Sequence, residues 1–169
     1  MALRDHVRKQ HDRTEAVFAA FSADPLARMD WFLSSHMSVL CAVSHALQRL
    51  DGSDIIAAFG RIQTALHADC TERGLTPVLL SHSFKGDPLA AAYVILGSRL
   101  GVQVLRRKVI DAGGGDYPAF FDEHQTAPAW RSLCIALDAI DPQSDRAEDI
   151  AEGAADIFDM FTAAAAANR

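Results

Sequence analysis

Three residues in this sequence have types and spacings suited to holding a metal-containing ligand. His11 lies in a stripe of residues spaced by three or four positions, and Gly97 and Gly101 lie four positions apart in one apolar segment. Each glycine weakens a helix by roughly 1 kcal/mol relative to alanine, so the pair needs a physical reason. An imidazole is a common metal ligand, and two glycines on one helix face allow a close approach to the backbone. Together they fit a large flat ligand, with the histidine bound to its metal on one side and the glycine helix against the other.

Each feature also has a purely structural explanation. A histidine in an apolar stripe is commonly a core residue whose ring binds a backbone carbonyl, and small residues four apart commonly let two helices pack closely. Ser98 follows Gly97 in a helical context, which does not favour a nucleophilic serine. The sequence has no His-Glu-x-x-His pair, no phosphate-binding loop and no dinucleotide fingerprint. Taken singly, neither the histidine nor the glycine pair distinguishes a site from a packing choice.

Helical spacing dominates the chain and predicts an all-α fold in one domain over residues 1–169. The stripe that contains His11 is formed by Leu3, Val7, His11, Thr14, Phe18 and Phe21. The expected helices are 3–21, 25–50, 54–73, 88–109, a short helix after 117, a longer one after 128, and 145–169, with a loop at 75–86. Asp-Pro pairs at Asp24, Asp87 and Asp141 predict three of the helix starts, because aspartate caps free N–H groups and proline fits the first turn.

Two segments resemble the heme oxygenase family. The segment "LRDHVRKQHDRTEAVF" at 3–18 is similar to the first helix of that family, with Leu3 and Arg4 at its start, His11 in the proximal position and Glu15 four positions on. The segment "AAYVILGSRLGVQVLRRKV" at 91–109 is similar to the distal helix of the bacterial branch, including the members found beside bacteriophytochromes. Both motifs occur in the order and separation that the family has, and the helix around Trp130 is compatible with it.

The resemblance implies a heme oxygenase-like helical fold with a kinked, glycine-containing distal helix, and cleavage of heme to biliverdin, carbon monoxide and ferrous iron. Heme is then both cofactor and substrate, O2 is the oxidant, and electrons come from an external reductant such as a ferredoxin or a reductase. His11 would be the proximal iron ligand and Glu15 would order its ring. Arg4 and Arg8 would meet the heme propionates through charge-assisted hydrogen bonds.

On the opposite side of the heme, the resemblance gives roles to the glycine helix and to the last helix. Gly97 and Gly101 would form the distal backbone approach, and Ser98 would lie near the oxygen-binding network, in a place where many relatives have an aspartate. Val102 stands where many relatives have a small residue, so its side chain would crowd the heme or redirect its edge. In the last helix, Phe158 and Phe161 would pack near the heme; no basic residue is evident there for the propionates.

Charge and composition indicate which kinds of binding partner and which cellular location to expect. The net charge of −6 argues against a general nucleic-acid binder, which needs a basic surface. The beginning of the sequence has no apolar core of a signal peptide, and its longest uncharged run in the glycine helix is too short to span a bilayer, which predicts a cytoplasmic protein without a membrane partner. Cys41, Cys70 and Cys134 stand far apart and are expected to be reduced core residues. No heptad seam is sustained, which favours a monomer.

The basic end of the glycine helix offers a docking place for an acidic electron donor, or simply complements the helix dipole. It consists of Arg106, Arg107 and Lys108. Two other functions stay open beside heme oxygenase. One is a heme-binding or heme-sensing protein without turnover, and the other is a protein of the same fold that binds a different small molecule.

Overall fold

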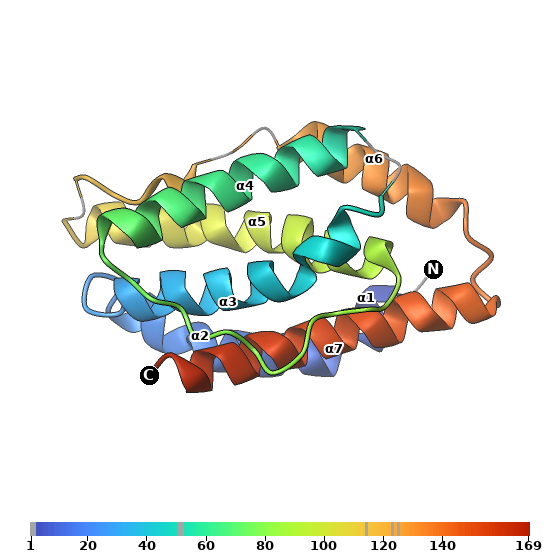
Figure 1. The fold of residues 1–169 in the computed structure, drawn as a ribbon, viewed down its shortest axis with the longest axis horizontal. Coiled ribbons are helices and arrows are strands. Elements are labelled where there is room, and N and C mark those ends of the chain that lie inside the picture. Colours follow the sequence, from blue (N-terminus) through green and yellow to red (C-terminus); the bar gives the residue numbers. More distant parts are fainter. Residues whose placement is uncertain (1–2, 51–52, 114, 123, 125) are drawn as a thin grey trace.

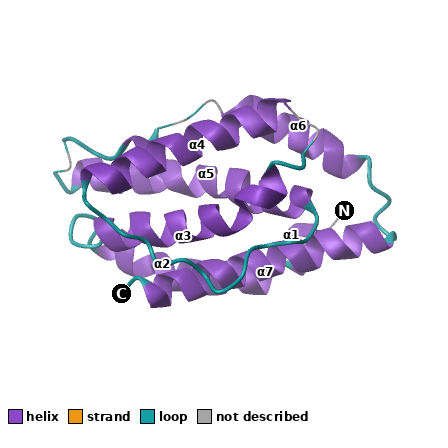
Figure 2. Cartoon of the chain, in the orientation of Figure 1, coloured by secondary structure: helices purple, strands orange, loops and turns teal. Residues whose placement is uncertain are grey.

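The chain forms a bundle of helices, as the computed structural model in Figure 1 shows. The structure describes residues 1–169 apart from 1–2, 51–52, 114, 123 and 125, and it contains no strand in that part. The elements are α1 (Leu3–His6), α2 (Arg8–Ala23), α3 (Met29–Leu47), α4 (Ser53–Glu72), α5 (Pro88–Asp111), η1 (Ala119–Phe121), α6 (Thr126–Asp138) and α7 (Asp145–Ala167). The predicted all-α class is confirmed, and Figure 2 shows helices joined only by loops.

The centre of the bundle is α3, which is buried on nearly all sides. Residues 32–40 are all buried, because α3 packs against α2, α4, α5 and α7. A helix that is apolar all round needs neighbours on every side. The other helices are amphipathic and place one face on this centre, so α3 fixes the distance between α2 on one side and α4 and α5 on the other.

The helix starts show what the Asp-Pro pairs do. Asp87 caps α5 as predicted, with its carboxylate accepting the N–H of Leu89 at 2.8 Å. Asp24 and Asp141 instead bind N–H groups inside turns that precede the helices. The prediction of a helix from residue 25 is therefore wrong, since α3 begins at Met29. The last helix begins at residue 145 as expected, but Ser144 caps it and Asp141 lies in the preceding turn. Aspartate followed by proline initiates a turn as readily as a helix.

The first predicted helix is divided into two. A turn at Val7 separates α1 from α2, although the N–H of Val7 bonds to Leu3 and the N–H of His11 bonds to Val7. Most of the predicted stripe is at least partly buried, but His11 is exposed. The predicted loop at 75–86 is confirmed, and Figure 1 shows it crossing the face formed by α3 and α7.

Candidate functional site

His11 lies on the surface of α2, where its side chain is 47% exposed. One edge of its ring packs against Phe158 of α7, with the ring centroids 5.5 Å apart and the planes nearly perpendicular. No backbone carbonyl binds the ring in the described part of the chain, so His11 is not the carbonyl-bound core histidine that was the structural alternative. The imidazole is held by an aromatic neighbour while its nitrogens face solvent and two carboxylates.

Those carboxylates belong to Asp12 and Glu15. Asp12 Oδ1 lies 3.5 Å from Nδ1 of His11, and Glu15 Oε1 lies 3.7 Å from Nε2. Both distances leave room for tighter hydrogen bonds, and either carboxylate can orient the ring and set which nitrogen carries the proton. Arg8 is exposed and lies 4.0 Å from Asp12. The side chain of Arg4 lies outside the described residues.

The glycine face of α5 is open at Gly101, whereas Trp130 of α6 covers it at Gly97. A Cβ at Gly101 would have no atom within 4 Å, and the flanking side chains of Leu100 and Val104 are 73% and 61% exposed. A Cβ at Gly97 would lie 3.5 Å from the ring of Trp130 in α6, which is ordinary van der Waals contact. Alanine would therefore fit at both positions, and helix packing requires neither glycine.

Gly153 of α7 shows what a glycine required by packing looks like in this bundle. A Cβ there would lie 3.0 Å from the ring of Phe84 and 3.1 Å from Cβ of Ala90. These distances are tighter than nine in ten real Cβ contacts, so a side chain at Gly153 would require Phe84 or Ala90 to shift by a few tenths of an ångström. The close-packing explanation considered for Gly97 and Gly101 thus holds at Gly153 and not at Gly101.

The side chains of Ser98 and Val102 make contacts within the protein and do not belong to the open face at Gly101. The Ser98 hydroxyl donates to the carbonyl of Ile95 at 2.8 Å, within its own helix. Val102 is 2% exposed and belongs to the core. Ser98 is half-buried beside Gly97. Val102 packs into the core, whereas Gly101, one residue earlier, faces solvent.

The two helices expected to enclose a ligand are α2 and α5, and they pack against the same two helices. Both pack against α3 and α7, and among the described residues they are not one of the helix pairs that pack closely on each other. His11 on α2 and the glycine face on α5 are each exposed. The surface around His11 on α2 and the surface around Gly101 on α5 are therefore not in close contact with each other.

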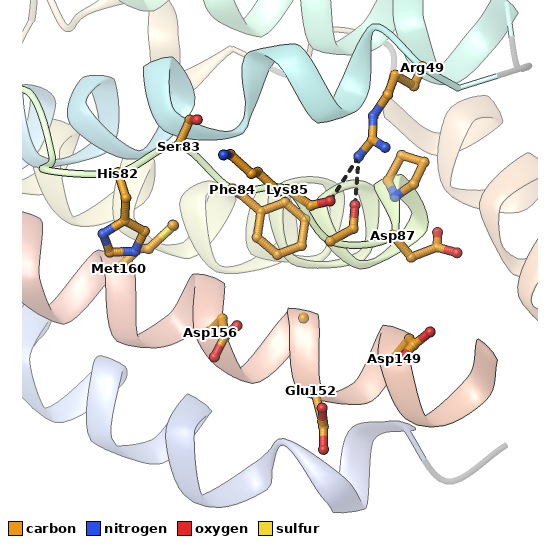
Figure 3. A pocket seen from close by; sticks show the side chains of 13 residues that line it. Arg49, His82, Ser83, Phe84, Lys85, Asp87, Asp149, Glu152, Asp156 and Met160 are labelled. Carbon is orange, nitrogen blue, oxygen red and sulfur yellow. Dashed lines mark hydrogen bonds between the residues drawn. The ribbon is translucent and has the colours of Figure 1, made fainter. Parts of the chain in front are cut away.

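A cavity lies on another side of the molecule. It has a volume of about 660 Å³ and lies between the loop before α5 and the outer face of α7, as Figure 3 shows. Arg49 crosses its upper edge and donates to the carbonyls of Lys85 and Gly86. None of the predicted site residues lines this cavity.

A charged clamp on the buried face of α5 was not visible in the sequence. The carboxylate of Asp69 in α4 accepts the N–H groups of Ala119 and Phe120 at 2.9 and 2.7 Å. Arg99 is 3% exposed, and its Nη2 donates to the carbonyls of Phe120 and Asp122 at 2.6 and 2.8 Å. Burial lowers the pKa of Arg99 to about 10.

This clamp has a consequence for the glycine face. Residues two positions apart in an α-helix point about 160° apart. Arg99 reaches inward to η1, so Gly101 must point outward. The fixed rotation of α5 is therefore what keeps Gly101 in solvent.

The buried histidine of this protein is His36, not His11. Its Nδ1 donates to the carbonyl of Phe32 at 2.8 Å, and four phenylalanine rings surround it with centroids between 4.0 and 5.3 Å away. Burial lowers the pKa of His36 to about 4, and the nearby positive charge of Arg99 acts in the same direction. His36 is thus neutral and structural at neutral pH.

Acid should destabilise the fold through His36. Between about pH 6.5 and pH 4 the unfolded chain takes up a proton at this position that the folded chain refuses. The free energy of unfolding should therefore fall as the pH drops through this window, by roughly 3 kcal/mol in all. Urea unfolding of the wild type and His36→Gln at several pH values measures it. The exposed His45→Gln variant should keep the full acid sensitivity; equal sensitivity in His36→Gln would contradict the assignment.

The basic end of α5 is only partly free. Arg106 bonds to the hydroxyl of Tyr117 and stacks over its ring, with 4.8 Å between the guanidinium carbon and the ring centroid. Arg107 and Lys108 are exposed. The cysteines also differ from the expectation of three core residues, since Cys41 is exposed and Cys70 is buried, although all three are free thiols.

The comparisons with protein-family models, with curated proteins and with solved structures found no match for this chain. Among the described helices, α5 is long and apolar enough to cross a membrane by length and composition. Half of that stretch is buried in the bundle, and a buried core helix passes the same test.

Proposed function

We propose that this chain is a heme oxygenase that cleaves heme to biliverdin, carbon monoxide and ferrous iron, using O2 and electrons from an external reductant. The observation that carries the proposal is the open glycine face of α5. Gly101 weakens its helix, meets no neighbour and lies between two exposed apolar side chains, Leu100 and Val104. A flat apolar ligand that covers this face explains both the glycine and the exposed side chains.

His11 supplies the second half of the argument. Its ring is exposed, is oriented by Phe158 and has carboxylates beside both nitrogens. A metal-binding histidine needs one free nitrogen and a partner for the other, and Asp12 and Glu15 offer that partner on either side. α2 and α5 are held relative to one another by α3 and α7, against which both helices pack.

The residues divide the work as follows. His11 binds the iron of the substrate, and Glu15 or Asp12 holds the ring in one orientation. Arg8 is exposed on the same helix and pairs loosely with Asp12 at 4.0 Å, so it would exchange this carboxylate for a propionate. Bound heme supplies the iron at which O2 is reduced and also the ring that is opened. The chain itself orients the heme and excludes side chains from one of its faces.

Reduction must come from another protein, because the sequence has no flavin or iron-sulfur motif. Arg107 and Lys108 are exposed at the end of α5 and suit contact with an acidic donor such as a ferredoxin. Arg106 is less free, because it is already bound to Tyr117. The docking surface proposed for the donor is therefore the part of α5 after Arg106.

One observation favours a second candidate, a heme-binding protein without turnover. Ser98 is the hydroxyl closest in sequence to the two glycines, and its single proton is donated to Ile95 in its own helix. A serine has one donor, so Ser98 must rotate before it can donate to a ligand. If it does not rotate, the chain binds heme but supplies no proton from this side.

Titration with hemin should give a Soret band that saturates at one equivalent. Addition of ascorbate or a ferredoxin system in air should then remove that band and produce the absorption of biliverdin. A Soret band that survives reduction under oxygen would replace the proposal by the second candidate. Failure of hemin to bind would leave a protein that takes a different small molecule on this fold.

A further inference from the structure

Three side chains of α2 lie close enough together to hold one metal ion. A ring nitrogen of His11 and one carboxylate oxygen from each of Asp12 and Glu15 all lie within 4.8 Å of one another. Within the residues that the structure describes, no other group of three histidine, cysteine, aspartate or glutamate side chains brings its ligand atoms so close. This cluster therefore differs from the other exposed acidic groups of the chain by its compactness and by its imidazole.

The distances are close to those that a bound ion requires. Ligand atoms around a four-coordinate ion lie about 3.3 Å apart, because each is about 2.0–2.1 Å from the metal. Asp12 Oδ1 is already 3.5 Å from Nδ1 of His11, and Glu15 Oε1 is 3.7 Å from Nε2. The side chains of Asp12 and Glu15 are 64% and 71% exposed, so both carboxylates have room to rotate toward one ring nitrogen.

The backbone that carries these ligands is fixed against α7. His11 and Glu15 are four positions apart, which places them on one face of α2. Thr14, which lies between them, donates its hydroxyl proton to the carbonyl of Phe158 at 3.1 Å. The ring of Phe158 also packs against the imidazole. Ligands on a helix held in this way keep their geometry better than ligands on a loop.

The donor atoms indicate which kind of ion fits. One imidazole nitrogen and two carboxylate oxygens suit borderline divalent ions such as Zn(II), whereas Mg(II) and Ca(II) prefer oxygen ligands alone. The two carboxylates together balance the charge of a divalent ion. Three protein ligands also leave at least one coordination position for water.

We propose that His11, Asp12 and Glu15 form a binding site for a divalent transition-metal ion, represented by Zn(II), on the heme-free chain. The site itself does not require heme and goes beyond the proposed function. One consequence rests on that function: His11 cannot bind this ion and heme iron at the same time, so the ion excludes heme from the chain.

Titration of the heme-free chain with Zn(II) against a zinc-sensitive dye tests the site. The wild type should take up one equivalent. His11→Ala and Glu15→Gln should each lower the affinity by at least about tenfold, since even residues that only orient metal ligands contribute that much. His45→Ala and Glu72→Gln change an exposed histidine of α3 and an exposed carboxylate of α4, and both should leave the affinity within about twofold.

Two further arms test the ligand set and the class of ion. Arg8 lies 4.0 Å from Asp12 and competes with the ion for this carboxylate. Arg8→Ala should therefore bind Zn(II) more tightly, by up to about fivefold, because an exposed ion pair holds its partner only weakly. Mg(II) should not displace Zn(II). Equal losses in the control variants, weaker binding in Arg8→Ala, or displacement by equimolar Mg(II) would each overturn the proposal.

A hemin titration with and without zinc tests the consequence for heme. At a zinc concentration ten times its dissociation constant, the apparent affinity for hemin should fall by about tenfold. Unchanged hemin binding under these conditions would overturn the exclusion of heme by the ion. If hemin binds in neither condition, the heme function fails, whereas the zinc site stands or falls on the titration of the heme-free chain.

Discussion

If heme binds as proposed, replacement of His11 by alanine should remove the protein's ligand to the heme iron and lower the rate of heme cleavage by at least about 100-fold. The side chain is 47% exposed and touches mainly Phe158, so its loss should not unfold the bundle. The position of the Soret band and the electron paramagnetic resonance spectrum of the ferric complex report the ligand. The yield of biliverdin per minute reports the turnover.

Added imidazole separates ligation from structure in this experiment. Free imidazole should restore the axial ligand to His11→Ala and return the spectrum toward that of the wild type. His45→Ala changes an exposed histidine of α3 and should alter neither spectrum nor rate. A wild-type spectrum and rate in His11→Ala would remove His11 from the site.

Local sequence patterns predicted one end of α5 and one end of α4 correctly. Asp87 caps α5, and Gly74, with a positive φ, follows the end of α4, both as expected. Asp24 and Asp141 have the same sequence context as Asp87 but form turns. The Asp-Pro pair alone is therefore compatible with either a helix start or a turn.

The two histidines show a different limit. His11 and His36 both lie in helical segments with apolar neighbours, and the apolar stripe around His11 is compatible with a buried ring. The structure buries His36 instead, because α3 is surrounded on all sides whereas α2 lies at the edge of the bundle. The number of helices packed around a given helix depends on the tertiary fold. The spacing of apolar residues along one helix does not predict it.

Arg99 was missed for a related reason. It stands between Ser98 and Leu100 in the glycine segment, where an arginine looks like a solvated surface charge. Its partners are carbonyls of η1 more than twenty positions away along the chain. No local pattern signals a buried arginine that binds backbone carbonyls, and only the fold brings Phe120 and Asp122 to it.

Gly101 carries the remaining strong prediction, because its role in stability and its role in binding have opposite signs. Gly101→Ala should raise the free energy of unfolding of the ligand-free chain by roughly 0.5–1 kcal/mol, since alanine favours the helix and nothing lies within 4 Å of the new methyl group. Gly60→Ala in α4 is a matched control, because Gly60 is also helical and also has open space. Both variants should gain stability in urea unfolding, and only Gly101→Ala should lose affinity for hemin.

A larger side chain at Gly101 should lower the affinity for hemin more than alanine does. Gly101→Leu places an isobutyl group on the face that the heme is proposed to cover, next to the exposed Leu100 and Val104. Hemin affinity should fall by at least about tenfold and biliverdin formation with it, while the ligand-free chain stays as stable as the wild type or becomes more stable. Circular dichroism and urea unfolding verify the fold, and a Soret titration measures the binding. Normal heme degradation by a folded Gly101→Leu would show that the ligand does not lie on α5, and the glycine would then be a site of helix weakness with no partner.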